Sequence, residues 1–331
     1  MASRFLLALC LIVTACASVS PPPAGAQEQL VEIRSSALTL KIDEPAATRV
    51  GRLIWRGGIE MKANSRNFGG WSDLHVSPDG RTLTSISDEG AWLTATVDYD
   101  AKRNLAGLSS AKLGQLRGLD GKPIESKAEA DAEALARLPD GAWLVALERR
   151  HRLWRYASLA ATPLPVEGPT EMSLQPKNGG MEALTAMADG TLVALSEEYS
   201  QKAGTVMGWI GKPAAGGRYT WSSFAYATIA DFQPTSITVL PDGSFATIER
   251  AFDMVRGVRC RVMRFDAAQL RPGATVRAEA LARLASPYAV DNLEGLAATR
   301  GAAGETLLWL ISDDNFNPLQ RNILMLFELA K

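Results

Sequence analysis

Short apolar runs recur along the chain in pairs, and a tight turn joins the two runs of each pair. The turn reads Pro78-Asp79-Gly80 in the first pair, and Pro139-Asp140-Gly141 and Pro241-Asp242-Gly243 repeat it. Proline presets φ in such a turn, aspartate bonds to the local backbone, and glycine takes the positive φ. Two further pairs surround Asp189-Gly190 and the longer turn Gly301–Gly304. Each of these five units predicts a strand, a turn and a second strand.

The units repeat every 50 to 60 residues or so, which is typical of a four-stranded blade with its loops. Their apolar runs are nearly continuous, as expected for strands buried between neighbouring sheets. Strand-like segments also occur at 31–42 and 52–62, and they could complete a blade begun by 324–329. We therefore predict an all-β chain folded as one six-bladed β-propeller. A pair of β-sandwiches is the rival fold, but it gives no reason for an acidic residue at the same position of several units.

The N-terminus has the pattern of an export signal. Arg4 precedes the apolar run Leu6 to Ala15, which is too short to span a bilayer. Cys16 then ends a lipobox-like sequence and is a candidate lipidation site; ordinary cleavage after Ala26 is the alternative. We predict a signal and proline-rich tether over 1–26 and one propeller domain over 27–331. The protein is then a periplasmic or outer-membrane lipoprotein, touching the membrane only through its lipid, or else a secreted protein.

Composition narrows the classes of partner. The 331 residues carry a formal net charge of −1, which gives no overall attraction to nucleic acid. Hydrophobic residues make up 47% of the chain, enough for an ordinary globular core. Cys260 is the one cysteine outside the signal region, so the body of the chain has no internal disulfide, and we interpret Cys260 as a small buried hydrophobe.

The first strand of each unit carries a repeated polar position. In a propeller this strand lines the central channel. The five equivalent residues are Ser72, Glu133, Glu182, Thr235 and Glu294, and the neighbouring polar residues include Asp131, Asp291 and Asn292. Carboxylates converging on one axis repel each other unless a cation lies among them or some are protonated. Oxygen ligands favour calcium. We therefore predict a divalent cation, calcium, bound by Asp131, Glu133, Glu182, Asp291, Asn292 and Glu294; the alternative is that these groups bind only water or bridge blades.

Polar residues also follow the second strand of each unit and should form one face of the ring. Asp88, Arg149, Arg150 and Arg250 are the candidate ligand-binding residues there, since arginines can hold an anionic group such as phosphate. A solvated rim is the plainer interpretation. The chain has no nucleophile-elbow, zinc-protease or phosphate-loop motif, and it has two histidines. His151 follows one strand exit, so His151 and Glu182 are the candidate catalytic residues.

Several of these segments together resemble a known family. They are Asp131-Ala-Glu133-Ala-Leu135, Asn178-Gly-Gly-Met-Glu182, Asp291-Asn292-Leu-Glu294 and Ser312-Asp313-Asp314-Asn315-Phe316. The set is similar to the phytase-like domain described as having esterase-like activity. The resemblance implies a propeller, secretion or surface attachment, and hydrolysis of a phosphoester or ester.

Three functions are compatible with these features. The first is a metal-dependent hydrolase of a small-molecule phosphoester or ester, in which the cation activates water and an acid acts as the base. The second is a non-catalytic surface propeller that binds a ligand or a protein. The third is a lactonase-like hydrolase that acts on uncharged esters. Arginines converging with the acids favour phosphate, whereas an apolar channel mouth favours lactones.

Overall fold

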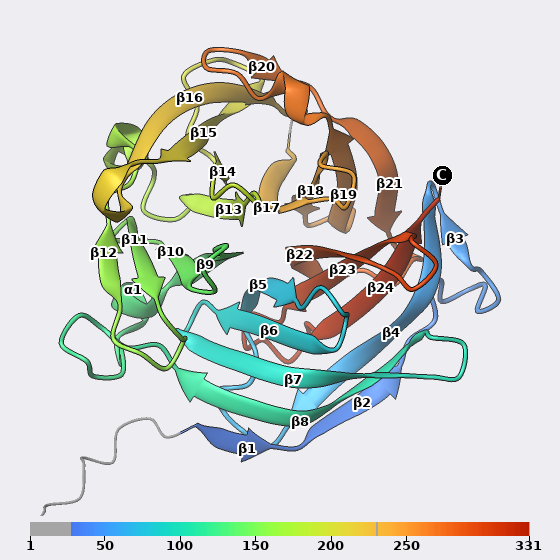
Figure 1. Ribbon diagram of the computed structural model, residues 1–331. Coiled ribbons are helices and arrows are strands. Elements are labelled where there is room, and N and C mark those ends of the chain that lie inside the picture. The colour runs from blue at the N-terminus through green and yellow to red at the C-terminus, as the bar shows by residue number, and fades with distance from the viewer. Residues whose placement is uncertain (1–27, 230, 331) are drawn as a thin grey trace, which may run out of the picture.

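The strand–turn–strand units become the inner parts of five sheets that surround one axis. A computed structural model describes residues 28–229 and 231–330 and places these sheets in a ring (Figure 1). The innermost strand of each sheet lies next to the centre, and the following strands lie progressively further out (Figure 1). The predicted β-propeller is therefore confirmed. Cys16 and the boundary after Ala26 lie outside the described residues.

Each sheet runs from an inner strand at the axis to an outer strand at the rim. In that order, the first sheet contains β5 (Trp71–Val76), β6 (Thr82–Ser87), β7 (Ala91–Tyr99), β8 (Leu105–Gln115) and β1 (Gln29–Val31). The second contains β9 (Ala132–Arg137), β10 (Trp143–Leu147), β11 (Arg152–Tyr156) and β12 (Leu164–Val166). The third contains β13 (Met181–Ala186), β14 (Leu192–Ser196), β15 (Thr205–Pro213), β16 (Tyr219–Ala227) and β20 (Thr275–Val276).

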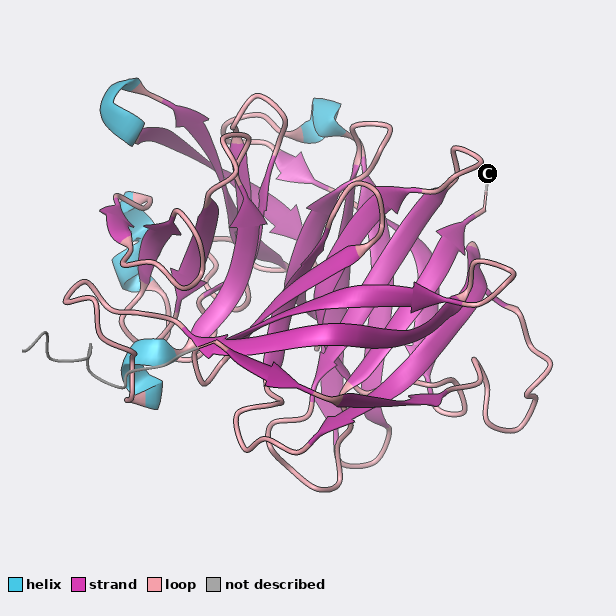
Figure 2. Cartoon of the chain, turned by 60° about the horizontal axis from the view of Figure 1, so that its bottom comes forward, coloured by secondary structure: helices cyan, strands magenta, loops and turns pink. Residues whose placement is uncertain are grey.

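The fourth sheet contains β17 (Gln233–Val239), β18 (Phe245–Asp253), β19 (Gly257–Phe265) and β21 (Glu279–Ala285). The fifth contains β22 (Asn292–Arg300), β23 (Thr306–Asp313), β24 (Ile323–Leu329), β4 (Leu53–Ala63) and β2 (Ile33–Ala37), and β3 (Arg49–Val50) pairs with β4. The helical elements are short: α1 (Lys127–Ala130) and the 3-10 turns η1 (Thr170–Leu174), η2 (Ala215–Gly217) and η3 (Ala267–Gln269). They lie in connections at the edge of the strands (Figure 2). No helix in the described part of the chain is long and apolar enough to cross a bilayer.

The described ring has five sheets, whereas the repeat pattern predicts six. The N-terminal strands form no sheet of their own: β4 pairs antiparallel with β24, with Gly58 opposite Met325, and β2 extends the same sheet. The shorter β1 instead pairs with β8 at the outer edge of the first sheet. The expected closure between the N-terminal segment and 324–329 is thus present, and it completes the fifth blade instead of adding a sixth.

The turn chemistry follows the sequence pattern. Gly80, Gly141, Gly190, Gly243 and Gly304 all have φ between 71° and 85°, a region that favours glycine. In four of the five turns the preceding aspartate accepts a hydrogen bond from the backbone N–H two residues later, at 2.9 to 3.1 Å. In these four blades the contacts help to fix the two inner strands in register.

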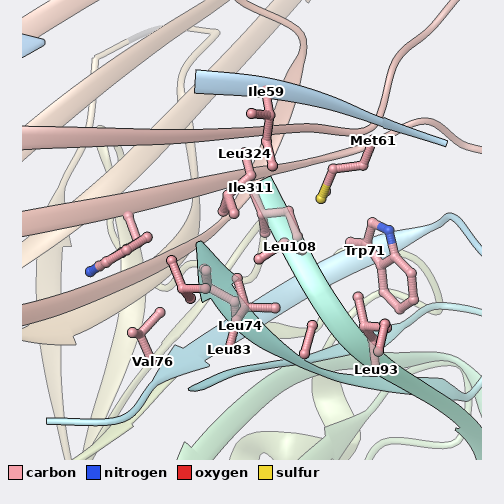
Figure 3. Close-up of a cluster of buried hydrophobic side chains, with 14 of the residues drawn as sticks. Ile59, Met61, Trp71, Leu74, Val76, Leu83, Leu93, Leu108, Ile311 and Leu324 are labelled. Atoms are coloured by element: carbon pink, nitrogen blue, oxygen red, sulfur yellow. The ribbon is translucent and has the colours of Figure 1, made fainter. Parts of the chain in front are cut away.

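Apolar side chains between neighbouring blades hold the ring closed. In one cluster Ile59 of β4, Ile311 of β23 and Leu324 of β24 pack with residues of the first sheet such as Leu74 and Leu83 (Figure 3). All five are at most 3% exposed. Since this cluster joins the last sheet to the first, burial of its apolar surface stabilises the closure of the ring.

Candidate functional site

Every inner strand contains a β-bulge at the position that the repeat alignment singles out. The pairing of β5 with β6 skips Ser72, because Trp71 pairs with Ser87 and Asp73 with Ile86. The same shift occurs once in each of the other four inner pairs. The skipped residues are Ser72, Glu133, Glu182, Thr235 and Glu294. A bulge re-aims the side chain that it leaves unpaired, so the five equivalent positions differ from the rest of their strands in the same way.

Three of the skipped residues are glutamates, and their carboxylates interact with one another. Burial raises the pKa of Glu133 and of Glu182 well above the ordinary value, and nearby carboxylates raise both further. Burial also raises the pKa of Glu294, to about 7, with Glu197 adding to the effect and Arg250 opposing it. These mutual influences place the three half-buried side chains in one region.

We call this region the acidic cup. It comprises Asp88, Asp131, Glu133, Glu148, Glu182, Glu197, Glu294 and Asp313, each of which influences the pKa of another member or is influenced by one. The basic residues that contact these carboxylates from close range are Lys127, Arg149 and Arg250. The cup therefore holds eight carboxylates against three cationic side chains.

One side of the cup could hold a metal ion. Asp131, Glu133 and Glu148 each offer an oxygen, and these oxygens lie within 4.8 Å of one another. Oxygen donors of this kind suit calcium or magnesium. Glu148 Oε1 is already committed, because it accepts hydrogen bonds from the N–H groups of Gly179 and Gly180 at 2.5 and 2.8 Å. Its second oxygen and both oxygens of Glu133 stay available.

Asp131 is the most strongly partnered member of this group. It accepts hydrogen bonds from Arg149 Nε and, at 3.2 Å, from Lys127 Nζ. Arg149 takes a φ of 56°, which is uncommon for a residue other than glycine, asparagine or aspartate. Two cations thus compete with any metal ion for Asp131.

The opposite side of the cup is organised by Arg250. This guanidinium donates to Asn292 Oδ1 at 2.7 Å and to Glu197 Oε1 at 3.1 Å, and it lies 3.6 Å from Glu294. Asn292 Nδ2 in turn donates to Glu294 Oε1 at 2.7 Å. Glu294 is therefore partly compensated. Glu133 and Glu182, by contrast, make no hydrogen bond or ion pair with any residue of the described chain.

Lys127 and two aspartates complete the wall. Lys127 of α1 forms ion pairs with Asp88 and with Asp131. Asp131 lies four residues after Lys127 in the sequence. Burial raises the pKa of Asp313 well above its ordinary value, and the nearby Glu294 and Asp88 raise it further. The acidic cup thus contains residues from the ends of the second strands of the blades as well as residues from the bulges of the inner strands.

The residues that follow the bulges in the inner strands are buried. Asp73, the residue after the first bulge, is 2% exposed and accepts hydrogen bonds from the N–H groups of Leu74 and Leu135 and from Ser236 Oγ, at 2.8 to 3.1 Å. It thereby links three blades.

The second residue after each bulge is aliphatic in all five blades. These residues are Leu74, Leu135, Leu184, Ile237 and Leu296, each at most 4% exposed. These five residues form an aliphatic layer whose side chains pack between neighbouring blades. The layer lies at a level of the inner strands between the bulges and the strands' later residues.

Three of the predicted site residues make their main contacts with residues that are not part of the acidic cup. Asp291 pairs with Arg321 at 3.3 Å and is not among the groups that shift the pKa of Glu133, Glu182 or Glu294. The side chain of Arg150 is 74% exposed and pairs with Glu129. His151 contacts the carbonyl oxygen of Pro176 through Nε2 at 2.7 Å, and its Nδ1 is buried without a hydrogen-bond partner in the described chain.

The remaining predicted residues lie in or around the cup, and some cup residues had not been predicted. Asp88, Asp131, Glu133, Glu182, Asn292, Glu294, Arg149 and Arg250 are among its members or their direct partners. Lys127 was missed, although its spacing from Asp131 on a short helix is a recognisable ion-pair pattern. Glu148, Glu197 and Asp313 lie where the second strands end, at the shared position where the sequence pattern predicted one polar face.

Comparison with known proteins adds a family match. The family model described as "Phytase-like: Esterase-like activity of phytase" matches residues 66–316. No curated protein matches the chain. Among solved structures, a protein of unknown function from Dyadobacter fermentans DSM 18053 is 13% identical, covers 93% of this chain and 100% of its own, and has a TM-score of 0.40.

Proposed function

Because the chain belongs to the phytase-like family described as having esterase-like activity, we propose that it is a cation-dependent hydrolase of ester bonds whose active site is the acidic cup. One observation carries the proposal. Glu133 and Glu182 are carboxylates without a described partner, placed by equivalent bulges in a region that disfavours their charged form. Such an arrangement is costly unless protons or a cation compensate it, and unusual pKa values cluster at functional sites.

The donor set supports a hard divalent cation, and calcium is our proposal. Glu133 and the second oxygen of Glu148 would be its most available ligands, with Asp131 contributing as Lys127 and Arg149 allow. When bound, the cation would lower the charge of the cup and activate water or polarise the ester oxygen.

Glu182 is the proposed general base. It lies among the acids of the cup, it has no described hydrogen-bond partner, and its raised pKa favours taking up a proton from water. His151 suits this role less well, because Nε2 is bound to a backbone carbonyl and Nδ1 is buried. Arg250, already oriented by Asn292 and Glu197, would stabilise negative charge developing on the substrate.

The charge of the cup bears on the substrate. Eight carboxylates against three cations repel a phosphoester unless cations are bound, whereas they repel an uncharged carboxylic ester or lactone much less. We therefore expect carboxylic esters to tolerate removal of the cation better than phosphoesters do.

A substrate panel tests the proposed function. The purified protein is assayed on 4-nitrophenyl phosphate, 4-nitrophenyl acetate and a lactone, with chelator and then with calcium, magnesium, manganese or zinc restored. We expect hydrolysis of at least one class, loss of it with chelator, and loss in Glu182→Gln but not in Glu32→Gln, a matched change at an exposed residue. Absence of hydrolysis under every condition would favour a non-catalytic binding propeller.

We further propose that the protein is exported and that Cys16 carries the lipid that holds it at a membrane. The support is the sequence pattern alone: an apolar run that ends in a lipobox-like cysteine. Mass spectrometry of the mature N-terminus tests it. A lipidated Cys16 supports an anchored lipoprotein, and a chain that begins at Gln27 supports simple secretion.

A further inference from the structure

The channel has a second chamber at the end opposite the acidic cup. The later residues of all five inner strands surround a cavity of about 450 Å³, within the range usual for small-molecule sites. At its inner end lies the aliphatic layer, whose side chains pack between the blades, and its partly exposed wall further out comprises Thr185, Ala186, Thr238, Val239 and Ala298. We call this cavity the lower bowl. A ligand there would have an apolar surface to lie on and hydroxyl groups beside it.

The lower bowl has the opposite charge character to the cup. Its described lining contains Arg137, Arg300 and His75 but no aspartate or glutamate. Arg300 already donates to the carbonyl oxygen of Pro241 at 2.8 Å. Arg137 makes no salt bridge with a described residue. Burial lowers the pKa of Arg137 and the nearby charge of Asp140 opposes this shift, but Asp140 is itself paired with Arg155 at 2.6 Å. The Arg137 guanidinium can therefore attract an incoming anion.

Trp143 positions two polar groups at this wall. The guanidinium of Arg137 lies over its ring, 4.3 Å from the centroid, and the ring of His75 meets it edge-on at 5.2 Å. Stacking of this kind holds an arginine in place without using its N–H donors. The ring nitrogens of His75 have no hydrogen-bond partner in the described chain, and burial, aided by Arg137, lowers the pKa of His75 to about 4. The imidazole is thus neutral at pH 7 and keeps one donor and one acceptor.

We propose that the lower bowl binds a small organic monocarboxylate. Its apolar body would lie against the partly exposed side chains of Ala186, Val239 and Ala298. Its carboxylate would pair with Arg137 beside His75. A free inorganic anion would not use this apolar wall, and a neutral apolar molecule would not use Arg137. This site is independent of the proposed hydrolase activity, because the aliphatic layer lies between the two chambers.

The two histidines of the chain make the site directly observable. His75 lines the lower bowl, whereas His151 contacts Pro176 near Gly180, next to the cup. Ring resonances are recorded by NMR while benzoate is added, and His151→Gln assigns the two signals. We expect a saturable shift of the His75 signals with His151 unmoved. Benzamide, which lacks the charge, and acetate, which lacks the apolar body, should each bind at least about tenfold more weakly, as loss of a charged or apolar contact implies.

Two variants and one control variant separate binding from folding. Arg137→Gln should weaken benzoate at least about tenfold, bringing it close to benzamide, whereas Arg103→Gln, which removes a surface arginine stacked on Tyr99, should not. Ala186→Leu adds volume at the wall and should block benzoate while leaving Arg137 in place. The proposal is overturned if benzoate leaves His75 unmoved, moves both histidines alike, or binds no better than benzamide and acetate.

Discussion

Replacing Glu294 by glutamine should remove a pH-dependent loss of stability from the cation-free protein. The folded state raises the pKa of Glu294 from 4.5 to about 7, so the folded protein holds this proton more tightly than the unfolded chain does. The resulting stabilisation is complete below pH 4.5 and is lost as the pH rises through 7. A rise of that size corresponds to about 3 kcal/mol in the free energy of unfolding.

The assay is urea denaturation, followed by tryptophan fluorescence, at pH 5, 6, 7 and 8 after removal of metal. Between pH 5 and 8 the free energy of unfolding of Glu294→Gln should fall by about 2 to 3 kcal/mol less than that of the wild type. Glutamine keeps the shape and can still accept from Asn292. Glu32→Gln, an exposed change outside the ring, should follow the wild type. If the free energy of unfolding falls equally with pH in the wild type and in Glu294→Gln, burial does not raise the pKa of Glu294 in the way that the acidic cup requires.

Three other substitutions test parts of the same arrangement. Asp73→Ala leaves buried N–H groups without an acceptor and should lower the free energy of unfolding by about 3 kcal/mol or more, measured by urea denaturation. Lys127→Met removes a cation that competes for Asp131, so calorimetry should show calcium binding several-fold more tightly in this variant, and unchanged or weaker binding would count against competition. Gly295→Ala places a Cβ 2.6 Å from Ile311 and 2.9 Å from the Cα of Asp73, so its melting temperature should fall clearly; an unchanged value would show that the inner strands can separate.

The parts of the structure that were predictable depend on local chemistry. Each Pro-Asp-Gly or Asp-Gly turn fixes its own hairpin, so aligning the turns also aligned Glu133, Glu182 and Glu294, which occupy equivalent bulges. The interpretation of Cys260 as a buried hydrophobe is confirmed for the same reason, since it belongs to an apolar strand and is 1% exposed.

The parts that were missed depend on contacts between distant segments. Whether the N-terminal strands form a sixth blade or extend the first and fifth is decided by pairing with β8 and β24, which are far away in sequence. Asp291 resembles a cup residue by position, yet its ion pair is with Arg321 from the loop before β24. No local pattern distinguishes these outcomes, because they depend on where the ring closes.

The most direct test of the acidic cup is a calorimetric titration of the metal-free protein with calcium at pH 7.5, repeated with magnesium, manganese and zinc. We predict saturable binding of a divalent cation that is weakened at least about tenfold in Glu133→Gln, as expected when a charged ligand is removed, and unchanged in Glu32→Gln. If none of the four cations binds to the wild type, the carboxylates of the cup are compensated by protons alone, and the proposed cation dependence is contradicted.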